Sequence, residues 1–216
     1  MTRAEEILRF WFADSLRNDA DLSPYVARWF GSDANFDRSI AERFGADTQQ
    51  AADGAFDGWK ESPRGRLALI ILLDQFTRNV FRGMAKAYAC DAQAAQICLE
   101  GLAAGADRSL APVERLFFYL PLLHSERLAD QDRSVECFRR LAAECDGAQS
   151  REFEQWLRLA RRHRRIVAWF GRFPHRNVIL GRTSTAAERI FLIQGRVRER
   201  AARNLRGFFG RRHQTA

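Results

Sequence analysis

Lysine and β-branched residues are scarce in this 216-residue sequence. Only Lys60 and Lys86 are lysines, whereas the other 33 basic residues are arginines. Arginine forms forked contacts with carboxylates and phosphates, although genome base composition can produce the same bias. Val, Ile and Thr total 22 residues, against 53 for Ala and Leu. Because β-branched residues favour strands and Ala and Leu favour helices, this composition predicts an all-α protein with no sheet.

The sequence also lacks the spacings typical of disulfides, metal sites and membrane spans. Its four cysteines form two Cys-x7-Cys pairs, Cys90 with Cys98 and Cys137 with Cys145, and this spacing on a helix is too wide for a disulfide. No Cys-x2-Cys or His-Glu-x2-His motif is present, so we expect no metal and no other cofactor. The longest uncharged apolar stretch, Leu116 to Leu123, is too short to span a bilayer, and the N-terminus has no signal-peptide pattern. Reduced thiols and a cytoplasmic location are therefore expected.

The segment from Pro63 to Gly83 is predicted to be the central helix. Ser62 can cap the helix, and Pro63 suits its first turn, where the missing N–H costs nothing. Residues 67–73 are apolar on every side, which indicates a helix enclosed by others. A buried strand is the alternative, but Leu and Ala outnumber β-branched residues here, so a helix is favoured.

A dense group of polar residues follows this apolar run. Asp74 and Arg78 are four residues apart, as are Gln75 and Asn79, so each pair is expected to share a helix face. One interpretation is a pocket that binds an anionic or amide-bearing ligand. The alternative is that Asp74 and Arg78 pair with each other while the amides cap neighbouring helices, because buried charges need partners.

Other elements are predicted from caps and helical spacing. A helix is expected to start at Asp33 and to end before Gly45, and Pro121 is expected to kink or stop the helix that opens at Pro112. The clearest periodicity runs from Arg151 to Phe170 and places His163 on its apolar stripe. His163 is interpreted either as a core histidine with one hydrogen bond or as a site residue near His175.

The loop that follows this helix, residues 171–185, is rich in Arg and delivers the chain to a helix N-terminus. The N–H groups and dipole at such an end favour phosphate or carboxylate. Thr185 and Glu188 form a capping box, however, and Glu188 would repel an anion. The loop is therefore either an anion site or a structural clamp. Its candidate residues are Arg172, His175, Arg176, Asn177 and Arg182.

The segment His124-Ser125-Glu126 resembles a catalytic triad in composition only. Adjacent residues in a chain do not face one another, and no Gly-x-Ser-x-Gly elbow is present. We expect no hydrolase nucleophile in this segment.

One domain is expected over residues 1–194, with a basic tail over residues 195–216. Seven Arg and one Glu give the tail most of the formal net charge of +8. Apolar residues recur in the tail at helical spacing, which would suit an anionic membrane surface or nucleic acid. A frayed, solvated terminus is the alternative.

Two long motifs match a known family. These are residues 65–79, GRLALIILLDQFTRN, and residues 170–185, FGRFPHRNVILGRTST. With Tyr119-Leu-Pro and His124-Ser-Glu between them, the chain resembles the family catalogued as domain of unknown function 924. The resemblance implies a right-handed helical superhelix of the tetratricopeptide-like kind, with about 9–11 helices, in a mostly bacterial family that carries no assigned activity. Leu123 and Arg127 depart from the family pattern, in which these positions are often acidic.

These observations lead to two functional hypotheses, both of which need the two motifs to meet around one groove. The first is a binding module for an anionic small molecule or an acidic peptide. The second is an enzyme in which Asp74 or a His is the general base and Arg residues stabilise negative charge. The proposed groove residues are Asp74, Gln75, Arg78, Asn79, His163, Arg172, His175, Arg176, Asn177 and Arg182.

Overall fold

The computed structural model describes residues 1–16, 21–145 and 150–195, and these residues contain helices and loops but no strand. The prediction of an all-α protein is confirmed. The chain divides into two compact units, Met1–Gly171 and Arg172–Ala216. The predicted boundary at residue 194 and the tetratricopeptide-like superhelix stay predictions.

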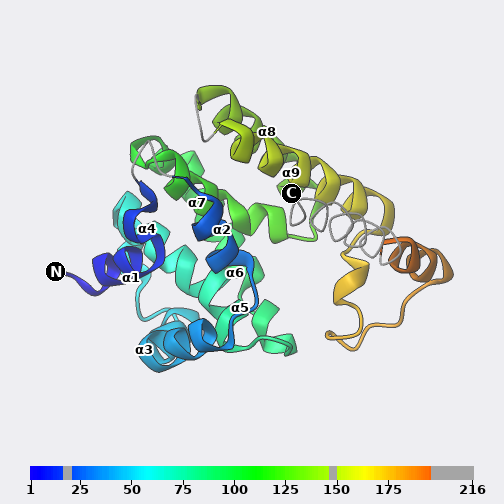
Figure 1. Ribbon diagram of the computed structural model, residues 1–216, viewed down its shortest axis with the longest axis horizontal. Helices are drawn as coiled ribbons and strands as arrows, with labels where there is room; N and C mark the ends of the chain where they lie inside the picture. Colours follow the sequence, from blue (N-terminus) through cyan, green and yellow to red (C-terminus); the bar gives the residue numbers. More distant parts are fainter. Residues whose placement is uncertain (17–20, 146–149, 196–216) are drawn as a thin grey trace, which may run out of the picture. The chain divides into compact units, whose positions relative to one another are not determined.

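The first half of the larger unit contains one long continuous helix, α3, one long interrupted helix and several shorter elements (Figure 1). Its elements are α1 (Arg3–Phe12), the 3-10 turn η1 (Ala13–Leu16), α2 (Ser23–Phe30), α3 (Ala34–Ala52), the 3-10 turn η2 (Asp57–Glu61), α4 (Pro63–Ile70), the π-helix η3 (Ile71–Phe76), α5 (Thr77–Val80) and the 3-10 turn η4 (Ala85–Tyr88). Its second half contains α6 (Asp91–Ala103), the 3-10 turn η5 (Ala106–Ser109), α7 (Pro112–His124), α8 (Leu128–Glu144) and α9 (Ser150–Phe170).

The predicted central helix is present as α4, η3 and α5, which follow one another without a break. Ser62 accepts a hydrogen bond from the backbone N–H of Gly65, and Pro63 occupies the first turn. Every residue from Leu67 to Leu73 is fully buried. The enclosing helices α1, α6 and α7 pack against α4, as Figure 1 shows. Complete burial of this segment explains why it is apolar on all sides.

Aromatic packing joins α7 to the N-terminal helices. The Phe117 ring lies edge-on to Trp11 and Trp29, with ring centroids 5.6 and 4.8 Å away. Trp29 also donates its indole N–H to the carbonyl of Trp11 at 2.9 Å. These contacts hold α7 in place, and α7 carries His124 at its C-terminal end.

One predicted helix end was wrong. Asp33 does cap α3, but the helix continues through Gly45 to Ala52. A glycine inside a helix is a cost of about 1 kcal/mol rather than a stop, and tertiary packing overrides it. Pro121 lies inside α7, which continues to His124, so of its two predicted effects the stop does not occur and the kink stays a prediction.

The smaller unit contains the 3-10 turn η7 (Pro174–Arg176) and a helix over residues 186–195. Residues 196–216, and with them nearly all of the predicted basic tail, lie outside the described residues. Among the residues that are described, none of the helices combines the length and apolar character that crossing a bilayer requires.

Candidate functional site

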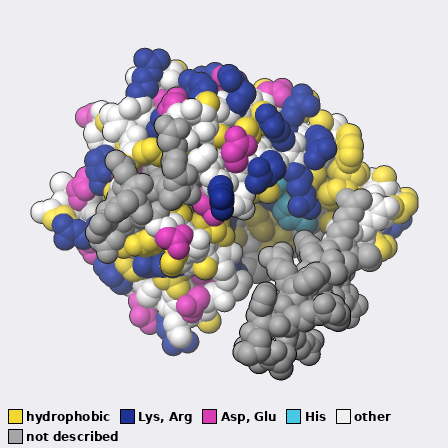
Figure 2. Space-filling model, turned by 45° about the horizontal axis from the view of Figure 1, so that its top comes forward, with side chains coloured by type: hydrophobic (Ala, Val, Ile, Leu, Met, Phe, Trp, Pro, Cys, Tyr) yellow, Lys and Arg dark blue, Asp and Glu magenta, His cyan; other side chains and the backbone are white. Residues whose placement is uncertain are grey.

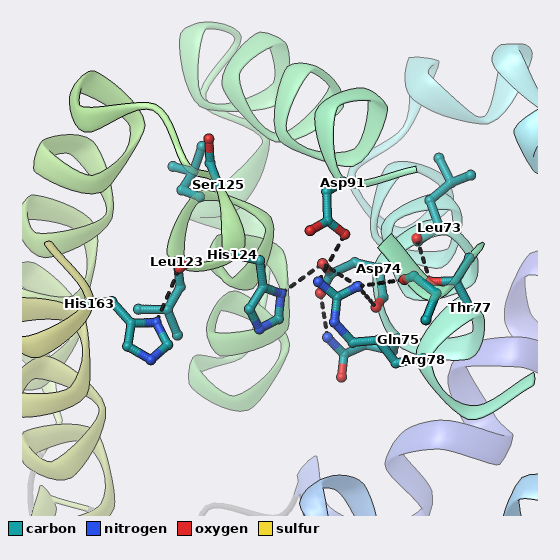
Figure 3. Close-up of polar contacts among 12 residues, drawn as sticks. Leu73, Asp74, Gln75, Thr77, Arg78, Asp91, Leu123, His124, Ser125 and His163 are labelled. Atoms are coloured by element: carbon teal, nitrogen blue, oxygen red, sulfur yellow. Dashed lines mark hydrogen bonds and ion pairs between the residues drawn. The ribbon is translucent and has the colours of Figure 1, made fainter. Parts of the chain in front are cut away.

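The most distinctive polar contact in the larger unit joins Asp74 to His124, two residues 50 positions apart in the chain. Nδ1 of His124 lies 2.8 Å from Oδ1 of Asp74 (Figure 3). The Asp74 side chain is completely buried, whereas 17% of the His124 side chain is exposed. The pair therefore has a buried carboxylate behind an imidazole that reaches the surface.

Asp74 lies in the π-helix η3, the wide turn in the middle of the central helix. Single π turns inside α-helices are rare and are frequently found at functional sites. Gln75, also in η3, donates from its side-chain amide to Oδ2 of Asp74. Each carboxylate oxygen of Asp74 thus has a side-chain partner, which offsets the cost of burying its charge.

His124 is the last residue of α7, and Gln131 of α8 fixes this helix end. The Gln131 amide nitrogen lies within hydrogen-bond distance of the carbonyl oxygens of Leu122, Leu123 and Ser125, at 3.1, 2.9 and 2.6 Å. Carbonyls at a helix C-terminus have no partner within the helix. A fully buried glutamine satisfies them here and so orients the residue that carries the imidazole.

Arg78 is occupied by its neighbours rather than open to a ligand. One guanidinium nitrogen lies 3.4 Å from Oδ1 of Asp74 and donates to the Asp74 carbonyl at 2.6 Å. The other donates to Asp91, in the first turn of α6, at 2.9 Å. Two carboxylates therefore share one guanidinium, and Arg78 is neutralised within the fold.

The pKa values of the pair follow from burial and from these charges. Burial raises the pKa of Asp74, but Arg78 and His124 outweigh it and hold the pKa at about 2. Burial lowers the pKa of His124 below its ordinary 6.5, although Asp74 acts in the opposite direction. At neutral pH His124 is therefore uncharged, and Arg78 is the charge that keeps Asp74 ionised.

These protonation states determine which nitrogen of His124 carries the proton. An ionised carboxylate can only accept hydrogen bonds, so Nδ1 of His124 must donate to Asp74. The proton then resides on Nδ1, and Nε2 has a lone pair. Nε2 has no partner among the residues that the structure describes, and Figure 3 shows it directed away from Asp74. Such a nitrogen can accept a proton.

The side chains of the predicted cluster point to different partners. Gln75 and Arg78 each contact Asp74, and the predicted pairing of Asp74 with Arg78 is present. Asn79 instead donates to Asp37 of α3 at 2.8 Å. The two amides therefore have different carboxylate partners and do not form one site.

His163 of α9 lies near the candidate site through the backbone. Its Nδ1 is 3.2 Å from the carbonyl oxygen of Leu123, the residue before His124, and its side chain is partly buried. In Figure 3 both imidazole rings flank the end of α7. His163 thus has the hydrogen bond expected of a structural histidine and also lies close to His124.

The other five predicted residues lie in the smaller unit, where each contacts residues of that unit. Arg172 donates to Glu188 at 2.7 Å, and it holds the pKa of that carboxyl at about 2. Arg182 donates to the side chain of Asn177 at 3.0 Å. The predicted capping box is present, because Glu188 and Thr185 exchange side-chain and backbone hydrogen bonds.

These contacts lie within residues 172–188, and both interpretations of the loop, an anion site and a structural clamp, stay predictions. Arg176 lies over the ring of Phe173, with the guanidinium carbon 4.7 Å from the ring centroid, and the ring of His175 is 5.5 Å from that of Phe173. A meeting of this loop with Asp74 stays a prediction.

His124 and Asp91 were missed as site residues by the sequence-based prediction. The sequence points to His124 only as part of His124-Ser125-Glu126 and as a metal ligand without a suitable spacing. Ser125 cannot complete a triad, because its hydroxyl donates to Asp130 at 2.6 Å. The position of His124 in the sequence could have identified it as a site residue. It is the first polar residue after the apolar run 116–123, where a helix leaves the core.

No group of three or more His, Cys, Asp and Glu side chains in the described part of the chain is arranged to hold a metal ion. The chemistry that His124 and Asp74 can perform as placed is proton transfer at Nε2 of His124.

Comparison with known proteins leaves this chemistry unassigned. No curated protein matches the chain. A solved structure of a protein of unknown function from Agrobacterium tumefaciens is 39% identical, with a TM-score of 0.74, over 88% of this chain and 96% of that chain. The family model described as bacterial protein of unknown function (DUF924) matches residues 7–196. With this match over most of its length, the chain belongs to the DUF924 family.

Proposed function

We propose that the protein is an enzyme in which His124 is a general base and Asp74 orients and supports it. Nε2 would take a proton from a water molecule or from a hydroxyl, thiol or amine of a bound substrate. The nearby Asp74 carboxylate would stay ionised and stabilise the imidazolium that forms. This division of roles between a buried carboxylate and a partly exposed imidazole is the one known from hydrolytic enzymes.

The observation that supports this proposal most strongly is the 2.8 Å contact between Nδ1 of His124 and the buried Asp74. A histidine that only filled space would not need an ionised, fully buried carboxylate, because burying such a charge costs several kcal/mol. Asp74 is part of the π-helix η3, and Gln131 contacts the carbonyls on both sides of His124. These two features hold the pair in a defined geometry.

The alternative, a binding module for an anionic ligand, has less support at this site. Arg78 is the cation it would use, and Arg78 already contacts Asp74 and Asp91. With His124 neutral, the side chains of Asp74, Arg78, Asp91 and His124 together carry one negative charge, which disfavours the binding of an anion. Anion recognition by the loop over residues 171–185 stays a separate prediction.

A cytoplasmic location is part of the proposal. Cys98 and Cys137 are buried thiols, and burial raises the pKa of both. Thiols of this kind suit a reducing compartment.

The first test is the tautomer of His124. Two-bond 1H–15N correlation spectra of protein labelled with 15N-histidine, assigned with His124→Gln, should show a proton on Nδ1 and none on Nε2 at pH 7.5. The resonance should titrate with a pKa below 6.5. An Nε2–H tautomer, or an imidazolium at pH 7.5, would remove the proposed base.

The second test is turnover on a panel of ester, amide and phosphoester substrates. Any activity found should fall by at least about 100-fold in His124→Gln, which is the usual range for loss of a general base. The wild-type rate should also decline as pH falls through the His124 pKa, because protonation removes the lone pair. Asp37→Asn, which changes a carboxylate outside the site, should leave the rate unchanged. Activity that survives in His124→Gln contradicts the proposal.

A further inference from the structure

A concave surface lies along α8 and α9, and its lining consists of arginines apart from Val135. It is a cavity of about 500 Å³ between Val135 of α8 and one side of α9. The lining residues from α9 are Arg158, Arg161, Arg164 and Arg165. Figure 2 shows Lys and Arg side chains gathered on the face of the molecule that is turned forward.

The charge of α9 is not balanced within the helix. Residues 150–170 include six Arg and two Glu. Arg164 pairs with Asp132 of α8 at 2.6 Å, and Arg158 lies 4.0 Å from Glu154. Within the described part of the chain, Arg161 and Arg165 have no carboxylate within ion-pair distance. Like charges four residues apart on a helix repel each other and destabilise it.

The spacing of these groups suggests the size of a ligand. Arg161 and Arg165 are one helical turn apart, a rise of about 6 Å, and Arg158 and Arg165 are about 10 Å apart along the axis. Two or more anionic groups at such distances can each contact a guanidinium, which offers paired donors for phosphate or carboxylate oxygens. Val135 adds an apolar contact on the opposite side of the cavity.

We propose that this groove, formed by Val135, Arg158, Arg161, Arg164 and Arg165, binds a small molecule that carries two or more phosphate or carboxylate groups. Its volume lies within the range of small-molecule sites, about 300–1,000 Å³. A long nucleic acid would use a basic surface that extends over many residues, whereas this lining is confined to two turns of α9 and one residue of α8. The groove is separate from the His124–Asp74 pair and does not depend on the enzyme proposal.

Isothermal titration with four probes tests the inference: pyrophosphate, tripolyphosphate, citrate and inorganic phosphate. We expect at least one multivalent probe to bind more than about 10-fold more tightly than inorganic phosphate, since it engages two guanidinium groups at once. The comparison of tripolyphosphate with citrate separates phosphate from carboxylate recognition. Binding should weaken as salt increases, because both partners are charged.

Matched variants assign the binding to the groove. The double variant Arg161→Gln, Arg165→Gln should bind the multivalent probe at least 10-fold more weakly than the wild type does. Arg139→Gln removes an arginine from α8 that pairs with Glu136 outside the groove, and it should bind as the wild type does. His124→Gln should also bind normally, which separates this inference from the enzyme proposal.

Three outcomes would overturn the inference: no probe binds at millimolar concentration, the double variant binds as tightly as the wild type, or a short RNA or DNA binds while the small anions do not. Exposed Arg→Gln changes are expected to leave folding intact. Urea denaturation of each variant checks this directly, and a folded double variant with unchanged affinity counts against the groove.

Discussion

Replacing Asp74 with Asn is the most direct test of how the site is held together. Asn keeps the size of the side chain but removes the charge that meets His124 and Arg78. Hydrogen bonds to charged groups contribute about 1.5–3 kcal/mol, and breaking a buried pair costs about 3–5 kcal/mol. Asn can still accept one hydrogen bond and Arg78 keeps Asp91, so we expect a loss of about 3 kcal/mol in the free energy of unfolding at pH 7.5.

The pKa of Asp74 gives an independent view of this magnitude. Its lowering from the ordinary 3.8 to about 2 corresponds to roughly 2 kcal/mol of stabilisation by the ionised form. Because the folded pKa is the lower one, this stabilisation is complete above pH 4 and is lost as pH falls toward 2. The difference in stability between wild type and Asp74→Asn should therefore shrink over that interval.

Urea denaturation from pH 7.5 to pH 2, followed by circular dichroism, measures both effects. Asp37→Asn is the matched control, since Asp37 also pairs with an arginine, Arg82, and the Asp37 and Arg82 side chains are 17% and 41% exposed. An ion pair that reaches solvent in this way contributes about 1 kcal/mol or less. If Asp74→Asn costs no more than Asp37→Asn, or if the difference from wild type persists unchanged to pH 2, the reasoning about a buried, ionised Asp74 is wrong.

Two further predictions concern the packing around the site. Gln131→Ala leaves the carbonyls at the end of α7 without their partner, so the free energy of unfolding should fall by about 2–3 kcal/mol. Urea denaturation measures this change. An effect below about 0.5 kcal/mol would show that this helix end does not need Gln131. Gly101→Ala places a methyl group 2.5 Å from both Arg66 Cδ and Phe118 Cζ and should cost about 1–3 kcal/mol by overpacking. The control is Gly45→Ala in α3, where the added methyl group has nothing within 4 Å. This change should raise the melting temperature, because alanine is the better helix former. Equal effects at the two positions would contradict the packing described for α6.

The pattern of residues along the chain was sufficient for most helices and several caps. Ser62, Asp33 and the pair Thr185 and Glu188 cap helices as their local sequence indicates. Caps and amphipathic spacing act within one or two turns, so the sequence expresses them locally. Gly45 shows where local sequence misleads, because packing of α3 outweighed the weak tendency of a glycine to end a helix.

Asp74 and its pairing with Arg78 were also visible in the sequence, because residues four apart share a helix face. The identification of the family rests on sequence as well, through the two long motifs.

The pairing of Asp74 with His124 could be identified only from the tertiary structure. His124 is 50 residues away, and a contact of that kind depends on how η3 and α7 pack, which no local pattern encodes. The π turn at Asp74 is similar, since such turns are rare inside α-helices and no residue pattern in this segment predicted one. Residue pattern thus determined which helices form, whereas long-range packing decided that a neutral imidazole meets a buried carboxylate.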